Sequence, residues 1–136
     1  SKGGNLLLNV GPDARGCIPQ ESVQILLELA RWMQKNGDSI YGCGYADRPK
    51  PENGRITRNG NKLYYHIYEA AIGDIPLEGL RREEVEKVRL LATGAEVKIS
   101  DSWMAANYPD TVFVNLGPIP LLPDPVDTVL EVTLKA

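Results

Sequence analysis

Hydrophobic residues follow different patterns in the two parts of the chain. Asn5–Val10 is a short, nearly continuous apolar run between Gly3-Gly4 and Gly11-Pro12. Continuous runs of this length are typical of strands buried on both faces of a parallel sheet, whereas half-solvated strands alternate. A helical pattern follows within about ten residues, so the pattern predicts a strand–loop–helix unit.

The helical pattern begins near Pro19 and ends near Gly37. Proline suits the first helical position and glycine the end, and the charges of Glu21 and Lys35 oppose the helix dipole. A narrow polar stripe is flanked by apolar residues on both sides, so the helix is expected to be covered on more than one side. A two-sided core helix of any α/β protein would show the same pattern.

Short strand-like runs replace the helical pattern beyond residue 54. The runs 55–58 and 61–69 flank Asn59-Gly60, which is the signal of a β-hairpin with a type I′ turn. Later candidate strands are 97–99, 111–116 and 128–135. Several short strands separated by turns predict an antiparallel sandwich.

Two features of these strands are specific expectations. In the second strand of the hairpin, alternate residues are expected to face opposite ways, with Leu63, Tyr65 and Ile67 on one side and Tyr64, His66 and Tyr68 on the other. Residues 80–91 are ambiguous, because their local propensity favours a helix. Val85, Val88 and Leu91 recur at near-helical spacing, so the local pattern by itself favours the helix.

Composition excludes several classes of protein. The 136 residues include 15 basic and 18 acidic side chains, for a net charge of -3, which argues against nucleic-acid binding. No apolar run approaches the roughly 18 residues that span a bilayer, so no membrane partner is expected. Cys17 and Cys43 lie at opposite ends of the predicted helix, roughly 25 Å apart. Because bridged Cα atoms lie within about 7 Å, both thiols are expected to be free.

Three blocks of sequence resemble one known family. They are residues 4–12 (GNLLLNVGP), 16–19 (GCIP) and 36–42 (NGDSIYG), with Trp32 between the last two. Their order and spacing resemble the end of the catalytic barrel in α-L-fucosidases of glycoside hydrolase family 29. The remainder is similar to that family's C-terminal β-sandwich through looser motifs. Against the local propensity of residues 80–91, this resemblance implies a strand over roughly Glu86–Ala92, ending at a turn at Thr93-Gly94.

The resemblance implies a domain organisation. Residues 1–43 would be the last βα unit of a (β/α)8-type barrel, 44–54 a linker and 55–136 a C-terminal β-sandwich domain. The chain is thus expected to be an α+β fragment, the C-terminal part of a larger protein, whose partner is the remainder of its own barrel. In the chain alone, Asn5–Val10 is expected to pack on the sandwich, self-associate or be poorly ordered.

The resemblance also implies an activity for the parent protein and predicts that this segment alone lacks that activity. The family consists of exo-acting retaining hydrolases of terminal α-L-fucose, so fucosylated glycans would be substrates of the parent. Retaining glycosidases need two carboxyl groups roughly 5 Å apart at the scissile bond. In the family both come from barrel strands upstream of the last one, so the segment is expected to contain no catalytic residue and to be inactive. No cofactor is implied.

Active sites of βα barrels lie at the C-terminal ends of the strands. Asn9, Val10, Gly11 and Pro12 are therefore candidates for the periphery of the sugar pocket. Asn9 offers an amide either to a substrate hydroxyl or catalytic side chain, or simply to backbone groups at the strand end. Both roles remain open at this point.

Other chemistry-bearing residues have structural interpretations. Asp13 is expected to form an Asx turn. His66 is the only histidine and has no second histidine or nearby cysteine, so no metal site is expected. The remaining candidates are aromatic residues that stack on sugars or fill a core: Tyr64, Tyr65, Tyr68 and Trp103. An alternative function is therefore a non-catalytic β-sandwich module that binds carbohydrate or protein.

Overall fold

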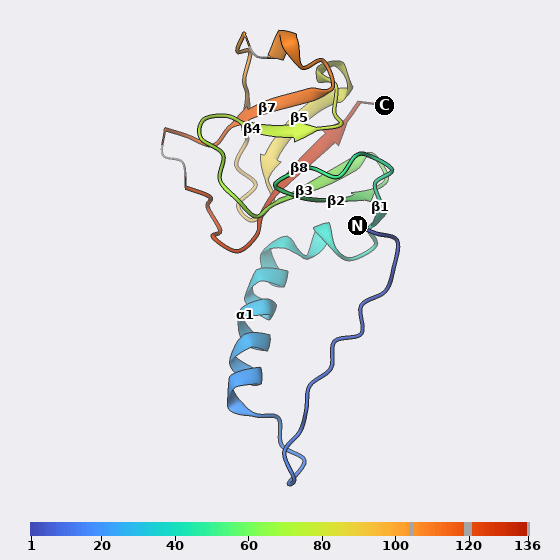
Figure 1. Ribbon diagram of the computed structural model, residues 1–136, viewed down its shortest axis with the longest axis vertical. Coiled ribbons are helices and arrows are strands. Elements are labelled where there is room, and N and C mark those ends of the chain that lie inside the picture. The colour runs from blue at the N-terminus through green and yellow to red at the C-terminus, as the bar shows by residue number, and fades with distance from the viewer. Residues whose placement is uncertain (104, 119–120, 136) are drawn as a thin grey trace.

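The computed structural model describes residues 1–103, 105–118 and 121–135. Within these residues, a single α-helix, α1 (Gln20–Asn36), stands below a β unit of two antiparallel sheets (Figure 1). The first residues form an extended segment that runs from the β unit to the far end of the helix. The chain is an α+β structure, as the sequence predicted.

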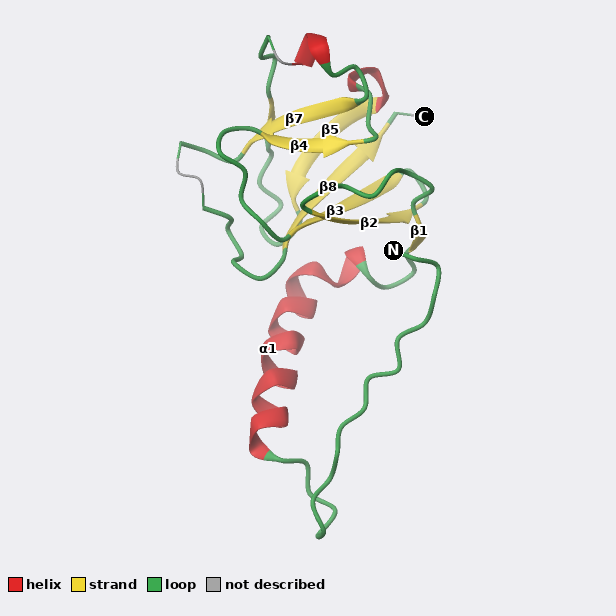
Figure 2. Cartoon of the chain, viewed as in Figure 1, coloured by secondary structure: helices red, strands yellow, loops and turns green. Residues whose placement is uncertain are grey.

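The two sheets contain only antiparallel neighbours (Figure 2). The larger sheet has the order β1 (Gly44–Tyr45), β2 (Gly54–Asn59), β3 (Lys62–Ile67), β8 (Thr128–Leu134) and β5 (Val85–Leu90). The smaller sheet has the order β4 (Ile75–Glu78), β7 (Thr111–Asn115) and β6 (Lys98–Ile99). Short 3-10 turns occur at η1 (Gly37–Ser39), η2 (Arg82–Glu84) and η3 (Ala105–Asn107).

One apolar core is shared by the two sheets. The larger sheet contributes Tyr65 and Leu130, and the smaller sheet contributes Leu77 and Val114, all four of them fully buried. Tyr65 also donates a hydrogen bond from its hydroxyl to the carbonyl of Glu78, at 3.0 Å. The aromatic ring thus fills the core while its polar tip has a partner, as buried tyrosines require.

Strand β3 is buried on both of its faces. Leu63, Tyr65 and Ile67 belong to the core cluster, whereas Tyr64 and His66 do not, so the predicted alternation is confirmed. The outer side chains are nevertheless buried. They are covered by the end of α1 and the residues that follow it, which the alternation alone does not reveal.

The hairpin of β2 and β3 is confirmed, but its turn is displaced by one residue. Asn59 pairs with Lys62, so the two central residues are Gly60 and Asn61 rather than Asn59 and Gly60. Among the described residues at this turn, only Gly60 has positive φ, at 58°. A type I′ turn requires positive φ at both positions, whereas glycine at the first position alone suits type II′. The predicted turn type was therefore wrong.

Residues 80–91 contain a strand and no α-helix. A short 3-10 turn at Arg82–Glu84 leads into β5, which pairs with β8 along Val88 and Leu90. The helix formers in this segment are overridden because Val85 and Val88 can be buried only on the sheet. Gly94, with φ of 75°, then reverses the chain as expected.

Helix α1 begins and ends differently from the prediction. Pro19 is the residue before the helix, with ψ of 142°, so the first helical residue is Gln20. Gly37 remains in the right-handed region, and the chain continues into η1 instead of stopping. A side chain at Gly37 would meet the ring of Tyr41 at 3.3 Å, so this glycine serves close packing rather than a left-handed cap.

The predicted strand at Asn5–Val10 is not a strand in this chain. It is extended but forms no ladder with any described residue, and Leu6 and Leu7 are 87% and 86% exposed. It does not pack on the β unit, which was one of the expected outcomes. A parallel strand needs neighbouring strands to bond its backbone. None of the described strands is parallel to it or adjacent in a sheet.

Candidate functional site

The four residues predicted at the pocket periphery lie together at the end of the extended segment. Asn9, Val10, Gly11 and Pro12 are all exposed, and among the described residues the amide of Asn9 has no hydrogen-bond partner. A Cβ at Gly11 would meet nothing within 4 Å. In this chain the four residues are therefore exposed to solvent, and no other described residues lie opposite them to form a pocket.

Asp13 forms the predicted Asx turn. Its Oδ1 accepts hydrogen bonds from the backbone N–H groups of Arg15, at 2.8 Å, and Cys17, at 3.0 Å. The bond from Cys17, followed by that from Arg15, holds the pKa of the Asp13 carboxyl below its ordinary value. A carboxyl with a lowered pKa stays ionised and is a poor general acid. Asp13 therefore stabilises its loop.

The aromatic residues divide into buried and exposed pairs. Tyr64 and Tyr65 are buried, and burial raises the pKa of the Tyr64 hydroxyl to about 12. Neither ring is available to stack on a sugar. Tyr68 and Trp103 are exposed, and Tyr68 borders a shallow polar depression of about 270 Å³ lined also by Arg55.

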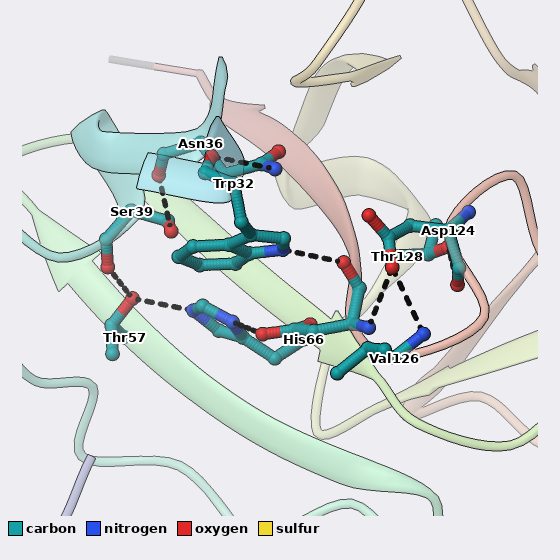
Figure 3. Close-up of polar contacts among 9 residues, drawn as sticks. Trp32, Asn36, Ser39, Thr57, His66, Asp124, Val126 and Thr128 are labelled. Carbon is teal, nitrogen blue, oxygen red and sulfur yellow. Dashed lines mark hydrogen bonds and ion pairs between the residues drawn. The ribbon is translucent and has the colours of Figure 1, made fainter. Parts of the chain in front are cut away.

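The most elaborate polar cluster joins α1 to the larger sheet. Trp32 donates from its indole Nε1 to the backbone carbonyl of Asp127, at 2.9 Å. Its ring lies 6.2 Å from that of His66, centroid to centroid, at 31° (Figure 3). Asp127 is itself held by Asp124, whose Oδ1 accepts from the Val126 and Asp127 backbone N–H groups. The cluster fixes the helix end over β3.

His66 is at the centre of this cluster and is only 4% exposed. Its Nδ1 lies 2.8 Å from Oδ2 of Asp127, and its Nε2 lies 3.5 Å from the hydroxyl of Thr57. Of the two expected locations, the protein interior and the surface, His66 occupies the interior. Trp32 and Asp127 could not be identified as its neighbours from the sequence, because the two are 95 positions apart and no local pattern links them.

A second buried charge cluster crosses the outer face of the larger sheet. Glu131 on β8 is 1% exposed and accepts hydrogen bonds from Arg89, at 2.7 and 3.0 Å, and Lys62, at 3.1 Å. Burial raises the pKa of Glu131, but the bonds from Arg89 and Lys62 outweigh it and leave the pKa below its ordinary value. The carboxylate is thus committed to structure.

The Glu131 cluster predicts acid sensitivity. A lowered pKa in the folded state means that the stabilisation is present above the unfolded-state pKa of about 4.3 and is lost as pH falls through the folded value. Urea unfolding at about pH 7 and about pH 3 should show a larger loss for the unchanged chain than for Glu131→Gln, which cannot titrate there. Equal losses in the two proteins would contradict this assignment.

No group of three His, Cys, Asp or Glu side chains among the described residues is placed to hold a metal ion. Both cysteines are free thiols, as predicted. Within residues 1–103, 105–118 and 121–135, no helix has the length and apolar character needed to cross a membrane.

What the described residues do present is a large uncovered apolar surface. It spans the extended segment and α1, and its exposed members are Leu6, Leu7, Leu8, Val10, Ile18, Ile25, Leu27 and Leu29. The concentration of large exposed apolar side chains in these two elements is typical of a surface that another part of a protein covers.

Comparison with known proteins identifies relatives of this chain. Residues 1–38 match the family model described as α-L-fucosidase. The α-L-fucosidase of Dictyostelium discoideum is 58% identical over 40 residues, which are 29% of this chain and 9% of that protein. Human tissue α-L-fucosidase is 27% identical over 131 residues, which are 88% of this chain and 26% of that protein.

Solved structures give the same result over nearly the whole chain. α-L-Fucosidase isoenzyme 1 from Paenibacillus thiaminolyticus matches 98% of this chain with 56% identity and a TM-score of 0.90. The Thermotoga maritima α-fucosidase in complex with a mechanism-based inhibitor matches 96% with 32% identity and a TM-score of 0.72. The chain covers 31% of each of these solved chains, and 9% and 26% of the two curated relatives above.

Proposed function

Because the chain belongs to the α-L-fucosidase family, glycoside hydrolase family 29, we propose that it is the C-terminal part of an enzyme that releases terminal α-L-fucose. The observation that carries the proposal is the match to the Paenibacillus enzyme, which extends over 98% of this chain at 56% identity. Identity at this level over the full chain includes both the helical unit and the β unit.

Residues 1–43 are proposed to complete the catalytic barrel. The exposed apolar side chains of the extended segment and α1 support this, because the strands and helices of a barrel are packed against apolar neighbours. Fully burying a leucine stabilises a protein by about 1.5–3 kcal/mol. Burial of Leu6, Leu7 and Leu8 would thus contribute several kcal/mol, comparable to a domain's net stability of about 5–15 kcal/mol.

Residues 55–136 are proposed to be the C-terminal β-sandwich that braces this barrel, with 44–54 as the linker. The shared core of the two sheets supports a unit that is stable by itself. The first residues of the linker are held by the β unit, because Gly44 and Tyr45 pair with β2 and Ala46 is buried in the core. A rigid connection of this kind favours bracing over independent movement.

The proposed role in catalysis is indirect. In a barrel, Asn9, Val10, Gly11 and Pro12 would lie at the C-terminal end of the last strand and just beyond it, bordering the pocket that receives the fucosyl group of a glycan. The two carboxyl groups of a retaining mechanism would come from the preceding part of the enzyme. The proposed partners of this segment are therefore the rest of its own barrel and, through it, the fucosylated substrate.

An aryl α-L-fucoside assay tests the proposal. The complete polypeptide from which this segment comes should release the aryl group, and its first sugar product should keep the α configuration, as a retaining mechanism requires. Retention is observed by NMR of the anomeric proton at early times. Hydrolysis with inversion, or none by a folded complete polypeptide, would overturn the proposed function.

A further inference from the structure

The outer face of the smaller sheet carries a group of neighbouring polar side chains. In the pairing of β6 with β7, Lys98 lies opposite Asn115. The adjacent residue on β7, Val114, belongs to the core, and side chains alternate along a strand, so Lys98 and Asn115 face outward. The open depression on this face has a volume of about 520 Å³ and is lined by Lys98, Ser100, Asp101, Ser102 and Asn115.

Hydrogen bonds hold the amide of Asn115 in place beside this depression. Its Nδ2 donates to Oδ1 of Asp74, at 2.7 Å, and its Oδ1 accepts from the backbone N–H of Gly117, at 2.9 Å. Hydrogen bonds from Ser100 and then from Asn115 lower the pKa of the Asp74 carboxyl, so Asp74 stays an ionised acceptor. A side-chain amide has two N–H groups, so Asn115 keeps one for a further partner.

The hydroxyl of Ser102 also has unused hydrogen-bonding capacity. Its Oγ is shielded from solvent, yet it has no hydrogen-bond partner among the described residues. Buried polar groups are normally hydrogen-bonded. The depression thus contains a hydroxyl and an amide N–H that can each bond to a bound molecule.

Aromatic side chains flank the same depression. Trp103 directly follows Ser102 and is 79% exposed. Tyr108 is 56% exposed and packs edge-on against Phe113, with 6.0 Å between the ring centroids. Phe113 adjoins Ser100, whose backbone N–H donates to the Phe113 carbonyl at 2.8 Å. An exposed indole beside polar groups suits an anchor for a ligand, because tryptophan is enriched among the residues that contribute most to binding.

The charges of the depression favour a neutral ligand. Lys98 and Asp101 are both exposed, and they bring one positive and one negative charge to the same depression. Such a pair gives little net attraction to a simple anion or cation. It offers donors from Lys98 and acceptors from Asp101, which suit a ligand rich in hydroxyl groups because each hydroxyl both donates and accepts.

We propose that the depression and Trp103 form a carbohydrate-binding site on the smaller sheet, whose ligand is a neutral pyranose of a glycan. The hydroxyl groups around a pyranose ring bond to Asp101, Ser102 and Asn115. The C–H groups on the face of the ring pack against the indole of Trp103. A few convergent polar groups beside an apolar surface are the usual composition of a small-molecule site.

The proposed site belongs to the β unit alone. Figure 1 shows β4 and β7 of the smaller sheet farther from α1 than β2 and β3. The exposed apolar side chains of the extended segment and α1 therefore lie away from the depression. The proposal does not depend on the proposed enzymatic activity, because every residue of the site lies between 98 and 115.

The two tryptophans give the test an internal control. Trp32 donates its indole N–H to the carbonyl of Asp127, near α1 and away from the site. In ¹H–¹⁵N NMR spectra of the 136-residue chain, methyl α-L-fucopyranoside or methyl β-D-galactopyranoside should shift the Trp103 indole signal saturably and leave that of Trp32 unchanged. No saturable shift with either sugar, or equal shifts of both indole signals, would overturn the proposal.

Matched aromatic variants locate the sugar. Trp103→Ala and Tyr68→Ala each remove an exposed aromatic side chain, and Tyr68 borders the other polar depression, lined also by Arg55. Measured by the backbone amide signals of Lys98 to Ser102, the affinity should fall about tenfold or more in Trp103→Ala and by less than about twofold in Tyr68→Ala. An equal or larger loss in Tyr68→Ala would overturn the proposal. The indole shifts of the unchanged protein need no variant, so they decide the question if Trp103→Ala fails to fold.

Sodium sulfate and sodium chloride distinguish a sugar site from an anion site at Lys98. Binding of a neutral sugar should be insensitive to sodium chloride, because ionic screening acts on charged ligands. Sulfate alone should not reproduce the saturable shift of the Trp103 indole. A sulfate response that equals the sugar response, or sugar binding that disappears as salt is added, would contradict a neutral pyranose as the ligand.

Discussion

The 136-residue chain by itself is expected to release no detectable aryl group from an aryl α-L-fucoside. A retaining glycosidase needs a nucleophilic carboxylate and a second carboxyl group as acid and base. Asp13 has a lowered pKa and is bonded within its own loop, and Glu131 is committed to Arg89 and Lys62. Enzymes accelerate their reactions by about 10⁶-fold or more, so turnover should fall at least that far below the complete enzyme.

This assay requires a control for contaminating fucosidase. The preparation should be compared with one of the Tyr65→Ala chain, purified in the same way, because a contaminant would contribute equally to both. Turnover that copurifies with the unchanged chain and is lower in the destabilised Tyr65→Ala chain would contradict the assignment of both carboxyl groups to the preceding part of the enzyme.

Tyr65→Ala is expected to destabilise the β unit by about 3–5 kcal/mol, the usual cost of removing a buried aromatic side chain. Tyr65 is fully buried between the sheets, so its removal leaves a cavity and an unpaired carbonyl at Glu78. Since domains have a net stability of about 5–15 kcal/mol, much of the chain's stability would be lost. Urea unfolding followed by circular dichroism measures this difference.

Two further tyrosine variants bracket the result. Tyr65→Phe removes only the hydrogen bond to Glu78 and should cost about 1 kcal/mol. Tyr68→Ala, at an exposed position just beyond the end of β3, should change the free energy of unfolding by no more than about 0.5 kcal/mol. If Tyr65→Ala lowered the free energy of unfolding no more than Tyr68→Ala does, the assignment of Tyr65 to the shared core would be contradicted.

The β unit was largely predictable because its local signals agree with its tertiary contacts. The alternation along β3 located Leu63 and Tyr65 in the core, and Asn59-Gly60 located the hairpin. Strand β5 was expected only from the family resemblance, because its local propensity favours a helix. The exact turn was not predictable from Asn59-Gly60, because a shift of one residue leaves the same dipeptide at the hairpin end. Strand β4 was missed, since Pro76 within it masks the pattern of an edge strand.

The polar clusters were not predictable, because their members meet only through the fold. Trp32 on α1 reaches Asp127 before β8, and Glu131 reaches Lys62 and Arg89 on its two neighbouring strands. The opening segment shows that a clear sequence pattern can also fail to predict the structure of this chain. Asn5–Val10 has the pattern of a buried strand, yet it is exposed here, since burial needs partners as well as pattern.

Amide hydrogen exchange of Leu6 to Val10 tests the central claim most directly, when it is measured in this chain and in the complete polypeptide. The account predicts rapid exchange in the 136-residue chain, whose segment has no bonded neighbour strand, and strong protection in the complete polypeptide, where barrel strands would flank it. Fast exchange of these amides in the folded complete polypeptide, or slow exchange in the monomeric chain, would contradict the account.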